Sequence, residues 1–213
     1  IPEDAELKKT AAASRDLIEF FQARATETPD NPEYPQYILR GYRLLGVAFA
    51  KAGRKEQAKE NLLDLISLQE RFIENHPETP DFANEVPLPY LGLIKLASEE
   101  GDHALLLDLA ASLGRLKVPD EHQAVYLYNA ACVVSLASGA VALDEDVPET
   151  ERMQLAEKHA MRAIELLAEA RTAGWFQEAK NIAEARDTDR SLAPLRQRDD
   201  FKQLLKELEE DSP

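Results

Sequence analysis

Apolar residues recur at intervals of three and four along most of the chain, which is the spacing of an amphipathic α-helix. Between residues 35 and 52 the stripe comprises Ile38, Tyr42, Leu45, Phe49 and Ala52. Similar spacing predicts helices over residues 4–28, 54–76, 83–100, 102–115, 150–173 and 199–210. Residues 121–138 are apolar on nearly every side, which predicts a helix covered on all its faces. The pattern therefore predicts an all-α fold.

Turn residues separate these helices. Gly53 is expected to end the helix over residues 35–52 in a left-handed conformation, which glycine adopts at little cost. Pro77 and Pro80 are expected to stop the following helix, because proline lacks the amide donor. Residues 140–151 predict an acidic loop, and the segment after Gly174 predicts less regular structure.

The chain contains an internal repeat. Residues 14–60 align with residues 62–108 without a gap, and the alignment places Pro29, Pro32, Tyr42 and Gly53 on Pro77, Pro80, Tyr90 and Gly101. We therefore expect a single repeat domain over residues 1–213, with helix pairs over 35–76, 83–115 and 121–173. A helix over 4–28 precedes these pairs and a cap over 175–211 follows them. The unpaired first helix suggests either a fragment of a longer protein or a capping helix at the start of the array.

One repeat carries a family pattern, formed by Tyr42, Leu45, Gly46, Phe49, Gly53, Ala58 and Leu62. This pattern resembles the tetratricopeptide repeat, although the unit is longer than is usual in that family. The resemblance implies a right-handed solenoid of antiparallel helix pairs, closed by a C-terminal capping helix. It also implies that the first helices of successive pairs line a groove for an extended peptide or a partner helix.

Four longer phrases suggest a narrower resemblance. They are residues 69–82 (QERFIENHPETPDF), 128–132 (YNAAC), 156–175 (AEKHAMRAIELLAEARTAGW) and 192–208 (LAPLRQRDDFKQLLKEL). These phrases are similar to the repeat region that follows the kinase domain in planctomycete serine/threonine protein kinases, except that Ala193 and Asp199 replace an acid and a proline. The resemblance implies a scaffold or sensor region of a larger bacterial protein.

Charge and composition exclude several classes of function. The 213 residues carry 40 acidic and 25 basic side chains, for a formal net charge of −15. A uniformly acidic surface repels phosphate backbones, so we expect no nucleic-acid binding. No apolar run approaches the ~20 residues of a membrane span, which predicts a soluble domain without membrane insertion. Its compartment is either the cytoplasm or the extracytoplasmic side of a membrane-anchored parent.

Catalytic chemistry is not expected in this chain. It has no glycine-rich phosphate loop and none of the catalytic motifs of a kinase. Glu100 and His103 match one half of the di-iron carboxylate motif, which needs two such pairs. Gly101 predicts a turn between them instead of a shared helix. Cys132 is expected to be a buried small side chain, and the acidic loop a solvated one. Trp175 and Phe176 are expected to pack back on the helices. The sequence predicts no enzyme activity, cofactor or metal.

One segment reverses the local charge. Residues 40–59 contain six basic side chains and one acid. By alignment with the tetratricopeptide pattern, the groove would be lined by Arg40, Arg43, Val47, Lys51, Leu88, Leu91, Lys95, Tyr126, Asn129 and Val133. The predicted ligand is a protein or peptide with an acidic segment or a C-terminal carboxylate, held by charge-assisted hydrogen bonds. The alternative is a structural or self-association module without a groove ligand, in which these cations form solvated helix faces.

Overall fold

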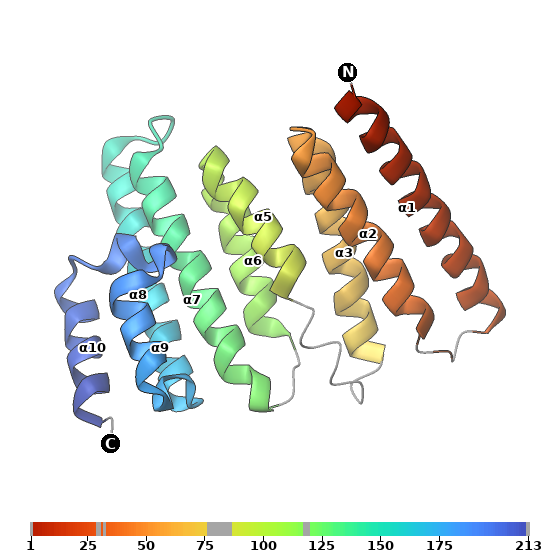
Figure 1. Cartoon of the computed structure of the whole chain (residues 1–213). Helices are drawn as coiled ribbons and strands as arrows, with labels where there is room; N and C mark the ends of the chain where they lie inside the picture. The colour runs from red at the N-terminus through yellow and green to blue at the C-terminus, as the bar shows by residue number, and fades with distance from the viewer. Residues whose placement is uncertain (1, 29–30, 32, 76–86, 117–119, 212–213) are drawn as a thin grey trace. The chain divides into compact units, whose positions relative to one another are not determined.

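The computed structural model describes residues 2–28, 31, 33–75, 87–116 and 120–211 (Figure 1). These residues form helices and turns without a β-strand among them, so the all-α prediction is confirmed. The long helices are α1 (Pro2–Glu27), α2 (Glu33–Lys51), α3 (Lys55–Asn75), α5 (Pro87–Glu100), α6 (His103–Arg115), α7 (Asp120–Leu143), α8 (Glu149–Thr172) and α10 (Asp199–Asp211). Four short helical segments precede α10, namely η1 (Trp175–Gln177), α9 (Ala179–Ala183), η2 (Glu184–Thr188) and η3 (Arg190–Leu195).

The chain divides into two compact units, Ile1–Leu96 and Ala97–Pro213. In unit 1, α2 packs against both α1 and α3. In unit 2, α7 packs against α6, α8 and η3. Each unit therefore has a central helix of its own, α2 in unit 1 and α7 in unit 2, and the single repeat domain over residues 1–213 stays a prediction.

The turns at the ends of α2 and α5 have the same geometry. Gly53 and Gly101 have left-handed φ values of 68° and 70°. After Gly53, the amide of Arg54 donates to the carbonyl of Phe49 at 2.9 Å. At the equivalent place in the second repeat, the amide of Asp102 donates to the carbonyl of Ala97 at the same distance. The repeat seen in the sequence therefore recurs in the backbone, where a left-handed glycine lets the chain satisfy the last helical carbonyls.

A tyrosine contact between helices also recurs in unit 1. The side chain of Gln22 on α1 is hydrogen-bonded to Tyr42 on α2. The hydroxyl of Tyr90 on α5 donates to Glu70 Oε1 on α3 at 2.6 Å. The repeat alignment that pairs Tyr42 with Tyr90 also pairs Gln22 with Glu70. Corresponding residues of the two repeats thus make corresponding helix-to-helix contacts.

Helix α7 is the central helix of unit 2. Its side chains are buried along most of its length, as the apolar pattern predicts. Within the described residues, the segment His122–Leu143 is long and apolar enough to cross a membrane, with 61% of the tested window buried inside the structure. The sequence prediction of no apolar run of this length is therefore corrected; polar residues such as Ser135 and Ser138 lie within the segment.

The predicted end of this helix was wrong. The helix was predicted to end at residue 138, but α7 continues through Gly139 to Leu143 and leaves a shorter acidic loop than expected. A Cβ placed on Gly139 would lie 2.9 Å from Cγ of Pro194 in η3. The glycine therefore permits a close approach of η3 to α7 instead of ending the helix.

Candidate peptide-binding surface

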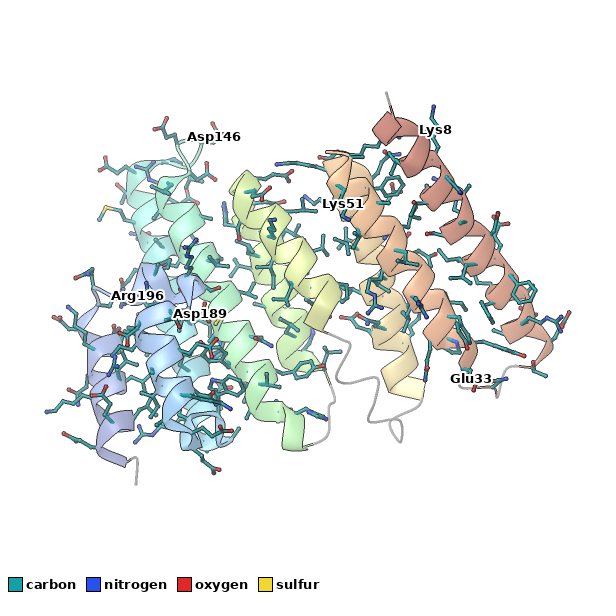
Figure 2. All side chains as sticks on the ribbon, viewed as in Figure 1. Lys8, Glu33, Lys51, Asp146, Asp189 and Arg196 are labelled. Carbon is teal, nitrogen blue, oxygen red and sulfur yellow. The ribbon has the colours of Figure 1, made fainter. Side chains whose placement is uncertain are left out.

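Helix α2 carries a row of exposed side chains along one side. Tyr37, Arg40, Leu44, Val47 and Lys51 follow each other at spacings of three and four, so they share one face of the helix. The exposed fractions of its three uncharged residues Tyr37, Leu44 and Val47 are 38%, 44% and 49%, and both cations are also exposed. We call these five residues the α2 stripe; Lys51, at the end of α2, is labelled in Figure 2.

Small residues on other sides of α2 explain why this face remains open. A Cβ on Gly41 would lie 2.6 Å from Cγ1 of Ile18 on α1. A Cβ on Gly46 would lie 3.3 Å from Cδ2 of Leu62 on α3. Both glycines let a neighbouring helix approach α2 closely, and the stripe occupies the side that these contacts leave uncovered.

The two cations of the α2 stripe are available to an external anion. Within the described residues, no carboxylate lies within ion-pair distance of Arg40 or Lys51. Arg43, which was also predicted to line the groove, is half-buried and already interacts within the chain. Arg40 and Lys51 can therefore offer their full hydrogen-bonding capacity to a ligand, and Arg43 cannot.

Helix α5 adds a smaller exposed surface to unit 1. Leu91 is 54% exposed, and Lys95, one helical turn later, is also exposed. A Cβ on Gly92 would lie 3.0 Å from Cδ1 of Leu62, the same α3 side chain that contacts Gly46. Leu62 thus brings α2 and α5 onto α3 together. The side chain of Leu88 lies outside the described residues.

The predicted contribution of α7 is not on an open surface. Tyr126 and Val133 are 2% and 1% exposed, and Asn129 is half-buried. The alignment placed them in the groove, but the apolar pattern of α7 reflects burial on all sides. The structure therefore corrects the prediction for Tyr126 and Val133, whose side chains lie in the core.

Cys132 belongs to a buried polar cluster that the sequence did not predict. The Oδ2 atom of Asp189 accepts from the Tyr128 hydroxyl at 2.7 Å and from Cys132 Sγ at 3.4 Å. Burial raises the pKa of the Cys132 thiol, and the Asp189 carboxylate raises it further. The cysteine is therefore a protonated donor at neutral pH, as expected for a structural residue, and a nucleophile would require the opposite shift.

The aromatic residues after Gly174 pack back on α7, as predicted. The ring of Trp175 stacks on Tyr128 with the centroids 4.9 Å apart, and Phe176 is buried beside the same ring. Asp189 accepts from the amide of Ser191 at 2.8 Å, while Arg196 donates to the Asp189 carbonyl (Figure 2). Cys132 and Asp189 lie far apart in the sequence, where no spacing signal connects them.

The remaining candidate ligands are dispersed. Glu100 ends α5 and His103 begins α6, so the left-handed Gly101 separates them and they do not share a helix. His103 Nδ1 lies 3.4 Å from Asp144 Oδ2 of the acidic loop, and burial lowers the pKa of His159. His76 is outside the described residues. In the part of the chain that the structure describes, no three His, Cys, Asp or Glu side chains are grouped to hold a metal ion.

Comparisons with known proteins identify no similar protein or family. No protein-family model matches the chain, and no curated protein or solved structure is significantly similar to it. The tetratricopeptide and kinase resemblances thus rest on the residues quoted above. The strongest physical indication of function is the α2 stripe. The sequence prediction did not include Tyr37 and Leu44, because the alignment placed neither of them in the groove.

Proposed function

We propose that this chain is a non-catalytic protein–protein interaction module that binds an acidic peptide segment along the α2 stripe. The observation that carries the proposal is the exposure of Arg40 and Lys51, without carboxylate partners in the described chain, on a protein of net charge −15. Tyr37, Leu44 and Val47 lie along the same face, so an extended peptide would meet both charge and apolar surface. Acidic residues of the peptide would accept charge-assisted hydrogen bonds from the two cations.

The proposed architecture is a tetratricopeptide-like solenoid of antiparallel helix pairs. It is supported by the matching turns at Gly53 and Gly101 and by the matching tyrosine contacts of Tyr42 and Tyr90. Repetition of both features at the same sequence offset is what an array of one structural unit requires. In such an array, Leu91 and Lys95 of α5 would extend the binding surface beyond the α2 stripe.

The setting we propose is a larger bacterial protein, in which this module follows a serine/threonine kinase domain of the planctomycete type. The support is the similarity of the four sequence phrases between positions 69 and 208. In that setting the module would bind the partner protein or sense the signal. The catalytic motifs would belong to the kinase domain. The expected ligand is the same with or without the kinase.

The test is fluorescence anisotropy with a labelled, blocked octapeptide of alternating glutamate and leucine, compared with its glutamine counterpart. Arg40→Glu combined with Lys51→Glu should weaken binding of the acidic peptide by at least about tenfold, because both changes replace attraction with repulsion. Lys9→Glu combined with Lys158→Glu is the matched control, since both lysines are exposed and the net charge changes equally.

Three outcomes would contradict the proposal. They are equal binding of the glutamine peptide, equal losses in the two double variants, or no binding by the native chain. A mass that rises with protein concentration, together with no peptide binding, would favour the alternative function of self-association. An additional peptide with a free C-terminal carboxylate distinguishes recognition of a chain end from recognition of acidic side chains.

A further inference from the structure

A second candidate surface lies in unit 1, where it is lined by residues of α1, α2 and α3. It is a hollow of about 360 Å³. We call it the acidic hollow, and its lining includes residues from all three helices: Glu19 of α1, Leu45 and Phe49 of α2, and Glu60 and Asp64 of α3. A volume of this size is in the range of pockets that receive a small molecule or a side chain.

The rim of the acidic hollow carries unbalanced negative charge. Glu19, Glu60 and Asp64 are exposed carboxylates, and Arg15 is the one basic residue in the lining. None of the three acids forms an ion pair within the described residues. Glu60 and Asp64 are four residues apart on α3, where like charges repel and destabilise a helix. A cation from outside the chain would relieve this repulsion.

The buried floor of the acidic hollow consists of three apolar residues together with Asn61. Ile18, Leu45 and Phe49 are buried and lie beneath the rim. Tyr42 is half-buried at the same place, and its hydroxyl is close enough to Asp64 for the two groups to interact. Burial raises the pKa of Tyr42 and the Asp64 carboxylate raises it further, whereas the hydrogen bond with Gln22 and the positive charge of Arg71 lower it. Carboxylates above aliphatic and aromatic side chains complement a cation on an apolar stem.

We propose that the acidic hollow binds a basic side chain, arginine or lysine, from a cationic segment of a partner protein. The aliphatic stem would lie on Leu45 and Phe49, and the charged group would meet Asp64, Glu60 and the Tyr42 hydroxyl. The site is distinct from the α2 stripe, because Leu45 and Phe49 are buried residues of α2 that line the hollow, whereas the stripe residues are exposed and do not line it. The inference goes beyond the proposed function and does not depend on it.

The probe for this site is a blocked tetrapeptide, Ala-Leu-Arg-Ala, titrated into the full chain and followed by NMR. Its control is the same peptide with citrulline, which has the shape of arginine but no charge. We expect the ring signals of Tyr42 and Phe49 and the side-chain amide of Asn61, which also lines the hollow, to shift with the arginine peptide. The citrulline peptide should bind at least about fivefold more weakly, because it lacks the charge interaction with the rim.

A pair of double variants separates the site from general electrostatics. Glu60→Gln combined with Asp64→Asn should weaken binding of the arginine peptide by about tenfold without loss of stability, since it removes a repulsive pair. Asp146→Asn combined with Glu151→Gln changes the net charge equally in exposed residues of unit 2 and should leave binding nearly unchanged. Equal binding of the citrulline peptide, equal losses in the two variants, or shifts that avoid Tyr42 and Phe49 would overturn the proposal.

Discussion

Replacement of Tyr128 by phenylalanine tests the buried cluster that ties the C-terminal segment to α7. The substitution removes the hydroxyl that donates to Asp189 Oδ2 at 2.7 Å and keeps the ring that stacks on Trp175. Asp189 Oδ2 would then retain the weak thiol donor of Cys132 at 3.4 Å, while the Ser191 amide serves Oδ1. A hydrogen bond to a charged group contributes about 1.5–3 kcal/mol. We expect Tyr128→Phe to lower the free energy of unfolding of unit 2 by about 2 kcal/mol.

The assay is urea unfolding followed by tryptophan fluorescence. Trp175 is the single tryptophan and belongs to unit 2, so its signal reports the unit that contains the cluster. Thr150→Val is the control, because it removes an exposed side-chain hydroxyl in unit 2 and should change the stability by less than about 0.5 kcal/mol.

The pH dependence gives an independent measure of the same interaction. Burial raises the pKa of Asp189, but the hydrogen bonds from Tyr128, Ser191 and Cys132 outweigh burial and hold it below its ordinary value. The ionised carboxylate therefore stabilises the fold above about pH 4, and this contribution disappears as the pH falls through the lowered folded-state pKa. In Tyr128→Phe the pKa of Asp189 should rise toward its ordinary value, so less stability is lost in acid.

Two results would refute this reasoning. The first is a loss of stability below about 0.5 kcal/mol for Tyr128→Phe, which would mean that the hydroxyl is replaced without cost. The second is an equally large acid-induced loss in the native chain and the variant, which would mean that the hydrogen bond from Tyr128 does not contribute to the lowered pKa of Asp189. A double-mutant cycle with Asp189→Asn then measures the coupling between the two side chains directly.

Two further predictions concern packing and backbone conformation. Leu62→Ala should destabilise unit 1 by about 2–5 kcal/mol, because the Leu62 side chain packs against both Gly46 and Gly92. The measurement is circular dichroism in urea, and a loss below about 1 kcal/mol would contradict this role. Gly174→Ala should destabilise unit 2 by about 1–2 kcal/mol, measured by Trp175 fluorescence, since Gly174 has a φ of 96° that an L side chain rarely adopts; unchanged stability would show that the turn relaxes.

The helices could be predicted from the chain because their causes are local. Three-and-four spacing identified α1, α2, α3 and α8 to within a few residues, and Gly53 and Gly101 ended their helices in the expected conformation. Gly139 has a different role, because it lies within α7 and allows the close approach of Pro194 from a distant part of the chain. A contact over that sequence distance leaves no periodic signal, so the end of α7 was placed too early.

The candidate surfaces show the same difference between what a helix determines locally and what packing against distant helices determines. Arg40, Val47 and Lys51 were predicted by alignment to line an open surface, and their side chains are exposed, because they lie opposite the buried face of α2. Tyr126 and Val133 were predicted from an alignment, and the packing around α7 buries them. Arg43 lies between these cases, since its charge suggested a binding residue and its position beside other helices leaves it half-buried.

The amino-acid sequence by itself determined the all-α class, the internal repeat and the positive charge on α2, since these depend on the order and spacing of residues along the chain. The tertiary structure decided which side chains are exposed and which are buried. The acidic hollow combines three helices, and the Asp189 cluster joins the segment before α10 to the middle of α7. Such groups come together only when helices pack, because packing depends on the shapes of distant side chains and not on their spacing along the chain.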